Sequence, residues 1–250
     1  MQQKIGIVIP CYNEAGRFDV SAIKKVLEEK SSYLTLLFVD DGSIDDTGTV
    51  LEDFCRNYNK EEAHCIALKE NMGKAEAVRY GMNYLMQTGT YDLIGYWDAD
   101  LATPFKALDD FVPIMEQRLD LLSVIGSRVK LCGRNVIRNP IRHYLGRIFV
   151  TFLNMMLSLS LYDTQCGAKL FRKDALEGNI DREFSSRWLF DVELLLRIQF
   201  KMGADICSWL YEYPLEEWTD IEGSKVTWKS FISALFDMLG IYVRFKLKKL

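Results

Sequence analysis

The 250 residues of this chain, about half of them hydrophobic, suffice for one large α/β domain or a domain with a small extension. With 31 basic against 35 acidic residues, the charge balance excludes the strongly basic surface of a nucleic-acid-binding protein. The six cysteines include no C-x-x-C pair, which argues against zinc ligation and indicates reduced cytosolic thiols.

The first half of the chain alternates short β-rich runs with amphipathic helical patterns. This alternation predicts βαβ units around a mainly parallel sheet, so the expected fold class is α/β. The expected strands cover residues 4–9, 34–39, 64–68, 93–97 and 121–126. The expected helices cover residues 20–29, 45–57, 74–86 and 103–116. Pro10 is expected to stop the first strand.

The pattern changes after Gly133, where spaced arginines lead into a strongly apolar helical segment at residues 138–161. A further helix is expected at 190–201, and an amphipathic helix rich in terminal Lys and Arg at 228–250. No linker rich in Pro, Gly or Ser separates these parts. We therefore expect a catalytic domain over residues 1–226 and a helical extension over 227–250.

Two carboxylates one residue apart, Asp98 and Asp100, directly follow the expected strand 93–97. A strand ending there holds both acids at its carboxyl edge, where open α/β sheets bind their ligands. Carboxylate oxygens suit Mg²⁺ or Mn²⁺, which commonly share their coordination with substrate phosphates. Taken alone, the pair also fits a solvated strand end or a helix N-cap.

Three more polar loops follow the preceding strands: Pro10-Cys11-Tyr12-Asn13-Glu14, Asp40-Asp41-Gly42-Ser43 and Glu70-Asn71-Met72-Gly73-Lys74. Because parallel strands bring such loops to one sheet edge, we expect the four loops to converge. Loop acids accept hydrogen bonds from bases and ribose hydroxyls, and glycine lets the backbone approach a phosphate. The set predicts a nucleotide-diphosphate site.

The strings I-P-C-Y-N-E, V-D-D-G-S-x-D-D-T, N-x-G-K-A-E-A-V and D-A-D-L-A-T-P resemble family 2 inverting glycosyltransferases of the GT-A fold. The resemblance is closest to the polyprenyl-phosphate sugar synthases, in particular the dolichyl-phosphate β-glucosyltransferase branch. Residues 163–171, DTQCGAKLF, and 187–194, RWLFDVEL, carry that closer likeness. The match extends from about residue 4 to about residue 228.

The resemblance implies roles for the matched positions. Asp98 and Asp100 bind the ribose and the metal, Asp100 being the direct ligand, and Lys225 contacts a phosphate. Asp163 matches an acid near the reacting centre, where it orients the acceptor or a metal-bound water. The residues expected to bind the nucleotide sugar are Pro10, Tyr12, Glu14, Asp40, Asp41, Gly73, Lys74, Asp98 and Arg128. Tyr12 stacks on the base or packs internally, and the sequence leaves both open.

Four of the candidate residues also have simpler structural explanations. Asp163, Asp191 and Glu193 are the candidate bases if the acceptor is a hydroxyl. Asp191 and Glu193 also fit residues that only cap or decorate the helix at 190–201. Lys225 also fits a solvated loop lysine. Cys166 is expected to be a small packed residue rather than a nucleophile.

The implied reaction moves a hexose, glucose from UDP-glucose, onto a polyprenyl phosphate with inversion and with Mg²⁺ or Mn²⁺. Two related reactions stay open: a GDP-mannose donor, and transfer to a glycan or soluble hydroxyl. A sugar nucleotidyltransferase would need a Gly- and Arg-rich loop after the first strand. A dehydrogenase would need G-x-G-x-x-G there. A nucleotide-sugar-binding protein without catalysis is argued against by the intact Asp98, Asp100 and Asp163.

Apolar residues beside Lys and Arg clusters in the segments 138–161 and 228–250 suit helices at an anionic membrane surface. No run of about 20 uninterrupted apolar residues is present, so we expect peripheral attachment on the cytoplasmic, inner face of the membrane. Such a location fits glycan synthesis at the cell envelope. The alternative is that these helices cover the sheet or a homodimer contact.

Overall fold

A computed structural model describes residues 3–59, 61–138, 140–220 and 236–247, and the chain forms two compact units. Unit 1 comprises Met1–Leu101 and Gly167–Glu183, and unit 2 comprises Ala102–Cys166 and Phe184–Leu250. The expected boundary at residues 226 and 227 lies outside the described residues, so that division stays a prediction. In the part of the chain with described structure, no helix is long and apolar enough to cross a bilayer.

Unit 1 is built on five strands in the order β3-β2-β1-β4-β7, of which only β7 runs antiparallel to its neighbour. The strands are β1 (Ile5–Cys11), β2 (Leu34–Asp40), β3 (Ala63–Ala67), β4 (Leu93–Trp97) and β7 (Ala168–Arg172). The helices are α1 (Val20–Lys30), α2 (Thr47–Cys55), α3 (Lys74–Thr88) and α6 (Lys173–Leu176). The expected βαβ alternation is confirmed, and β7 is a strand that the sequence pattern did not predict.

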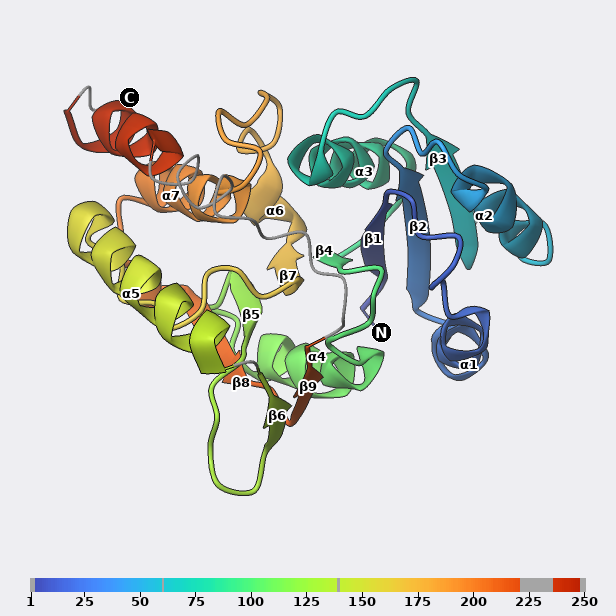
Figure 1. Cartoon of the computed structure of the whole chain (residues 1–250), viewed down its shortest axis with the longest axis horizontal. Coiled ribbons are helices and arrows are strands. Elements are labelled where there is room, and N and C mark those ends of the chain that lie inside the picture. The colour runs from blue at the N-terminus through green and yellow to red at the C-terminus, as the bar shows by residue number, and fades with distance from the viewer. Residues whose placement is uncertain (1–2, 60, 139, 221–235, 248–250) are drawn as a thin grey trace. The chain divides into compact units, whose positions relative to one another are not determined.

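Helices cover both faces of the unit 1 sheet (Figure 1). On one face, Phe54 of α2 packs edge-to-face against Phe38 of β2 and against Phe18. Val8 points to the other face, where α3 comes so close that a Cβ on Gly81 would meet its side chain at 2.5 Å. Both faces of β1 and β2 are therefore buried, which explains their continuously apolar sequences.

The first strand does not stop at Pro10, as the sequence predicted, but continues to Cys11. The N–H of Ile5 donates to the Tyr33 carbonyl, directly before β2. Because N–H directions alternate along a strand, the odd-numbered residues of β1 donate toward β2. Pro10 is even-numbered, so its missing N–H would point toward β4, whose pairing with β1 ends at Val8. The proline therefore removes no ladder hydrogen bond, and the strand tolerates it.

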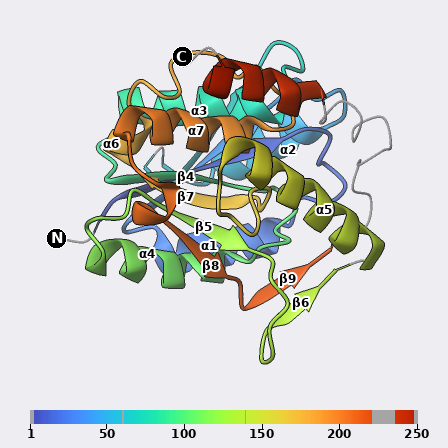
Figure 2. The same ribbon diagram turned by 90° about the vertical axis from the view of Figure 1, so that its left-hand side faces the viewer.

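Unit 2 contains two parallel strand pairs, β5 (Ser123–Ser127) with β8 (Leu210–Pro214) and β6 (Asn135–Ile137) with β9 (Glu217–Thr219). Its helices are α4 (Leu108–Gln117), α5 (Pro140–Leu157) and α7 (Phe190–Met202). Unit 2 also contains 3₁₀ turns at Phe105–Ala107 and Ile206–Ser208 and a π-helical turn at Val243–Leu247. Figure 2 shows α4 and α7 on opposite sides of the β5–β8 pair.

A last helix over residues 236–242 leads into the π-helical turn and packs on α7 (Figure 1). Met238 and Ile241 are fully buried. Arg244 donates to the buried carboxylate of Glu193, and Ser186 donates to Asp237 at 2.6 Å. The expected helix at 228–250 is thus helical in its described part, and its inner face is fixed by both apolar and polar contacts.

Candidate active site

The loops that follow β1, β2, β3 and β4 meet at the carboxyl edge of the unit 1 sheet and hold one another by hydrogen bonds. The N–H of Asn13 donates to Ser43 Oγ at 3.0 Å, and the N–H of Ile44 donates to Asn13 Oδ1 at 3.0 Å. The N–H of Glu14 donates to Thr47 Oγ1 at 2.7 Å. The expected convergence of these loops is confirmed.

Asp41 ties the second loop to the third. Its buried carboxylate accepts the N–H groups of Met72 and Gly73, both at 2.8 Å, and the Asn71 amide at 3.0 Å. The turn at Gly42 has a φ of 63° and passes so close that a Cβ would lie 2.5 Å from the Glu70 carbonyl carbon. Asp41 therefore shapes this edge of the sheet.

Two further acids at this edge already have protein partners. Asp40 accepts the Ser43 N–H at 3.0 Å and lies at the end of β2. The Glu14 carboxylate accepts hydrogen bonds from Nε and Nη2 of Arg17, and this ion pair raises the pKa of Arg17. These partners fix the carboxylate positions before any ligand binds. Tyr12 is half-buried in the same loop.

Asp98 and Asp100 stand after β4, as the sequence predicted. Lys74, at the first position of α3, forms an ion pair with Asp98, with Nζ 2.6 Å from Oδ1. About a third of the Asp98 side chain and two fifths of the Lys74 side chain remain exposed. Leu101 then adopts a φ of 52°, a left-handed conformation that is strained for a leucine and turns the chain directly after the two acids.

The donor set at this edge fits a divalent cation that shares its coordination with a ligand. Among the described residues, no group of three or more His, Cys, Asp or Glu side chains could enclose a metal ion. Mg²⁺ characteristically needs only one or two carboxylates, because water and substrate phosphates complete its shell. The half-exposed Asp98 and its neighbour Asp100 meet that requirement.

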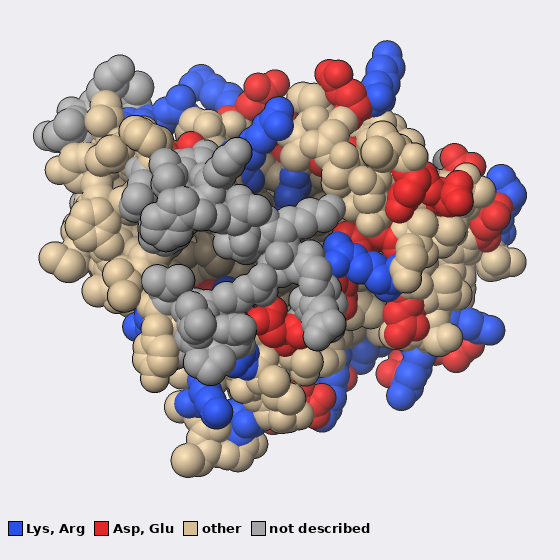
Figure 3. All heavy atoms as spheres, viewed as in Figure 1, with Lys and Arg blue, Asp and Glu red and all other residues tan. Residues whose placement is uncertain are grey.

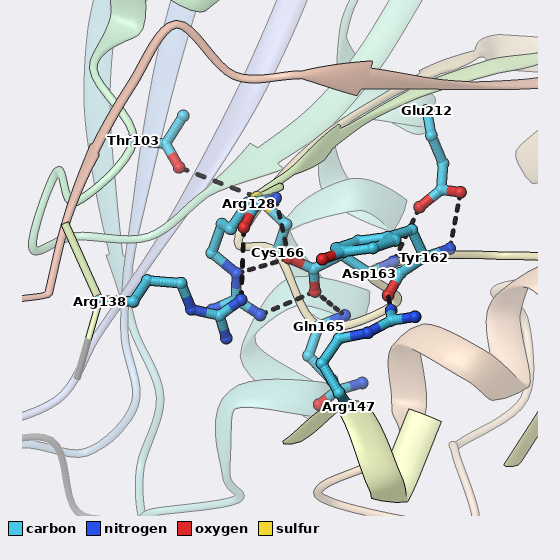
Figure 4. A network of polar contacts seen from close by, with 9 residues as sticks. All are labelled: Thr103, Arg128, Arg138, Arg147, Tyr162, Asp163, Gln165, Cys166 and Glu212. Atoms are coloured by element: carbon cyan, nitrogen blue, oxygen red, sulfur yellow. Dashed lines mark hydrogen bonds and ion pairs between the residues drawn. The ribbon is translucent and has the colours of Figure 1, made fainter. Parts of the chain in front are cut away.

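In unit 2, Asp163 is buried and fully engaged by Arg128, which follows β5 (Figure 4). Arg128 Nε lies 2.6 Å from Oδ2 and Nη2 lies 2.8 Å from Oδ1, a bidentate pair. The Arg128 backbone N–H adds a bond to Oδ2 at 3.0 Å, and that of Gln165 one to Oδ1 at 3.2 Å. Four donors thus fix one carboxylate.

Burial by itself raises the pKa of Asp163, but the charge and hydrogen bonds of Arg128, with the charge of Arg138, lower it well below its usual value. The carboxylate is therefore ionised at neutral pH and is a very weak base. Burial and the neighbouring Arg128 lower the pKa of Arg138, whose Nη1 donates to the Arg128 carbonyl at 3.4 Å.

Aromatic rings and a third arginine extend this arginine cluster, which we define as Arg128, Arg138 and Arg147. Both Arg128 and Arg138 lie over the ring of Trp218, at 5.3 and 5.6 Å from its centroid. Arg147 lies 3.7 Å from the Tyr162 ring centroid and donates to the Tyr162 carbonyl at 2.7 Å. A guanidinium stacked on an aromatic face is stabilised there by its π contact, which uses none of its N–H groups.

Glu212 of β8 supports the backbone beneath the cluster. Its two carboxylate oxygens accept the N–H groups of Tyr162 at 2.7 Å and Asp163 at 2.8 Å. Burial raises the pKa of Glu212 even though these bonds lower it. Glu212 therefore places Asp163 opposite Arg128.

Of the remaining candidate site residues, Glu193 and Cys166 have structural roles, and the roles of Asp191 and Lys225 stay predictions. Glu193 is fully buried and accepts Ser185 N–H at 2.8 Å and Arg197 at 2.8 Å, so it organises the start of α7. Asp191 is buried in the first turn of the same helix, and its role stays a prediction. Cys166 is confirmed as a packed residue, buried 3.8 Å from Thr103 Oγ1. Lys225 lies outside the described residues.

Asp163 and Arg128 were separate candidates from the sequence, which did not predict their pairing. Arg138 and Arg147 were visible among the spaced arginines but had no predicted role. A row of basic residues directly before an apolar helix was the available signal. Glu212 had no signal, because a single acid in a short strand looks like any surface residue.

The chain belongs to glycosyl transferase family 2, whose sequence profile matches residues 6–179. It is thus a glycosyltransferase. It is 31% identical to human dolichyl-phosphate beta-glucosyltransferase, over 97% of this chain and 76% of the human one. The Dictyostelium discoideum protein of the same name is 32% identical, over 97% and 75% of the two chains.

Comparison with solved structures shows that this chain has the GT-A fold. Glucosyl-3-phosphoglycerate synthase of Mycobacterium tuberculosis, in complex with Mn²⁺, UDP and glucosyl-3-phosphoglycerate, has a TM-score of 0.61 at 17% identity, covering 96% of this chain and 80% of that one. A mannosyltransferase of Pyrobaculum calidifontis, in complex with GDP-Man and Mn²⁺, has a TM-score of 0.60 at 16% identity, covering 98% and 65%. The expected mainly parallel α/β fold is confirmed.

Proposed function

We propose that this glycosyltransferase transfers a hexose from a nucleotide sugar, UDP-glucose, to a polyprenyl phosphate, with inversion at the anomeric carbon. The observation that carries this proposal is the arginine cluster on the ionised Asp163. The likeness to dolichyl-phosphate beta-glucosyltransferases over nearly the whole chain supports the glucosyl group and the polyprenyl-phosphate acceptor.

The arginine cluster has the chemistry of a receptor for a phosphate. Arg128 and Arg138 both act on the buried Asp163 carboxylate, and Arg147 lies on Tyr162 beside it. The three guanidinium charges outnumber the two carboxylates of Asp163 and Glu212. Guanidinium groups bind phosphate oxygens in pairs of parallel hydrogen bonds. Asp163 holds Arg128 in place, and Trp218 supports both Arg128 and Arg138. We assign the acceptor phosphate to this cluster.

The weak basicity of Asp163 also favours a phosphate acceptor over a hydroxyl. A hydroxyl must lose its proton in the reaction, which needs a base with a pKa near the working pH. A phosphate monoester is already ionised at neutral pH and can attack directly. Its oxygen forms the new bond to the anomeric carbon while the bond to the nucleoside diphosphate breaks, and the leaving group keeps the electron pair. No proton transfer is required.

The loops of unit 1 would hold the donor. The nucleoside would bind at the sheet edge, where protein hydrogen bonds already fix Glu14, Asp40 and Asp41. Pro10 and Tyr12 would line the same site. Gly73 and Lys74 open α3, whose first N–H groups can face a phosphate. Asp98 and Asp100 would hold Mg²⁺ or Mn²⁺, which when bound neutralises charge on the departing diphosphate. Lys74, paired with Asp98, would add a second positive charge beside the diphosphate.

We further propose that unit 2 lies on a membrane surface, where a polyprenyl phosphate resides. One side of α5 exposes an apolar stripe, which we define as Tyr144, Ile148, Phe152 and Met155. The last helix exposes Phe236, Leu239 and Val243. Figure 3 shows the surface on the left, where α5 lies in Figure 1, mostly without charged side chains. Exposed apolar patches of this kind mark interaction surfaces.

A donor and acceptor screen tests the proposal. UDP- and GDP-sugars are offered with Mn²⁺ or Mg²⁺, each with undecaprenyl phosphate, with the matching polyprenol, or with a soluble glycan. We expect release of the nucleoside diphosphate from UDP-glucose, only when the lipid phosphate is present. Equal turnover with polyprenol or glycan would contradict the phosphate acceptor, and a preference for GDP-mannose would contradict the donor.

A further inference from the structure

Gly167 lies against Asp98 in unit 1, and none of the roles above explains a glycine at this position. The residue directly precedes β7, and its carbonyl accepts the Asp98 backbone N–H at 2.9 Å. Its φ is not in the positive range that favours glycine. The backbone conformation alone would therefore permit a side chain.

Space explains the glycine instead. A Cβ on Gly167 would lie 2.5 Å from Asp98 Oδ1, and Oδ2 and Cγ would be closer still. Atoms of the protein do not approach a Cβ so closely, so the carboxylate would have to move. At the same time, the Lys74 ammonium holds Oδ1 at 2.6 Å. The Asp98 carboxylate therefore has its orientation set by two contacts, the Lys74 charge and the bare Cα of Gly167.

We propose that Gly167 is a positioning residue that holds the Asp98 carboxylate in the orientation used for the donor and its cation. This inference rests on the proposed function, in which Asp98 binds the nucleotide sugar and the metal. The overlap involves the end of a side chain rather than backbone, so alanine at 167 turns the carboxylate away. Loss of a group that orients a metal ligand typically weakens metal binding by about 10- to 100-fold.

The test measures binding of UDP with Mn²⁺ by calorimetry to the wild-type chain and to Gly167→Ala. We expect the Kd to rise by about 10- to 100-fold in the variant. Gly6→Ala is the matched control, because its Cβ would meet Leu85 Cδ1 at 2.9 Å in the core of the same unit. That change lowers the melting temperature without altering the Kd. An unchanged Kd in Gly167→Ala would overturn the inference.

A double variant shows whether Gly167 acts through Asp98. In an Asp98→Ala background, Gly167→Ala should cause no further loss of UDP affinity, because no carboxylate is left to displace. If Gly167→Ala alone folds poorly, Asp98→Ala should restore its melting temperature for the same reason. A further loss of affinity, or persistent instability, in the double variant would contradict the proposed route.

The crystal structure of Gly167→Ala separates this inference from the proposed function. We expect the Lys74–Asp98 ion pair to be broken or displaced in the variant. An ion pair unchanged from the wild type would overturn the inference whatever the enzyme binds. A wild-type chain that binds neither UDP nor GDP with Mn²⁺ would instead count against the proposed function, while the variant structure still decides the role of Gly167.

Discussion

Arg128 binds Asp163 with its side chain and its backbone at once: Nε lies 2.6 Å and the backbone N–H nitrogen 3.0 Å from the same oxygen, Oδ2. This arrangement fixes the end of β5 to the segment before β7. It also keeps the carboxylate ionised and leaves it little capacity as a base. We therefore propose that Asp163 holds an arginine rather than accepting a proton.

The first prediction concerns Asp163→Asn, which removes the charge that Arg128 and Arg138 surround. Breaking a buried ion pair by removing one partner typically costs roughly 3–5 kcal/mol in the free energy of unfolding. We expect a loss of this order at pH 7, measured by urea unfolding. Asp120→Asn is the control, since Asp120 pairs with Arg118 at the surface and should change stability little.

The same pair predicts a dependence on pH. The folded state lowers the pKa of Asp163, so its ionised form is favoured by folding. This stabilisation is complete above the unfolded pKa of about 3.9 and is lost as the pH falls below that value toward the folded pKa. The stability difference between wild type and Asp163→Asn should therefore shrink below pH 4. A constant difference from pH 7 to pH 3 would contradict this account.

Arg138→Gln should weaken acceptor binding selectively. A hydrogen bond to a charged group contributes about 1.5–3 kcal/mol, so we expect the KM for the lipid phosphate to rise by about 10- to 100-fold. The KM for the nucleotide sugar should stay nearly constant. Arg134→Gln is the matched control, because Arg134 pairs with Glu216 outside the cluster. Equal effects of the two substitutions on the acceptor KM would speak against the assignment.

Asp100→Ala should abolish turnover that depends on Mg²⁺ or Mn²⁺ while leaving the melting temperature close to that of the wild type. The side chain is only partly buried at the sheet edge, so its loss should cost little stability. Activity is measured as release of the nucleoside diphosphate over a series of Mn²⁺ concentrations. Wild-type activity in the variant, or in excess EDTA, would show that the cation assignment is wrong.

Ile148→Glu should reduce binding to vesicles that contain anionic lipid. The side chain is 67% exposed in the middle of the apolar stripe on α5, so the substitution opposes membrane contact without disturbing the core. Leu119→Glu is the control, since Leu119 is 76% exposed at the end of α4. Vesicle flotation separates the two. Unchanged flotation of Ile148→Glu would show that the apolar stripe does not contact the membrane.

Glu193→Gln should destabilise unit 2 more than it alters chemistry. The carboxylate is fully buried and accepts hydrogen bonds from Arg197 and Arg244. Removing its charge leaves two guanidinium groups facing a neutral amide, and we expect a loss of roughly 3–5 kcal/mol by urea unfolding. A variant of wild-type stability that lacks activity would instead favour the reading of Glu193 as a catalytic base.

Much of unit 1 could be predicted because its signals are local. Continuous apolar runs marked β1, β2 and β4, and helical periodicity marked α1 and α3. Parallel strands then necessarily place their following loops on one edge, which brought Glu14, Asp40 and Asp98 together. Pro10 misled the prediction, because a local rule on missing N–H groups took no account of where the neighbouring strand ends.

The order of residue types along the chain was enough to indicate the α/β class, the acidic sheet edge and the glycosyltransferase family. Only the tertiary structure decided that Asp163 is held by Arg128, that Glu212 supports it, and that Gly167 leaves room for Asp98. These contacts join residues 35 to 69 positions apart in the chain. The hydrophobic periodicity of a segment shows only which of its faces is buried. Contacts between distant residues depend on strand order and register, which no local sequence pattern records.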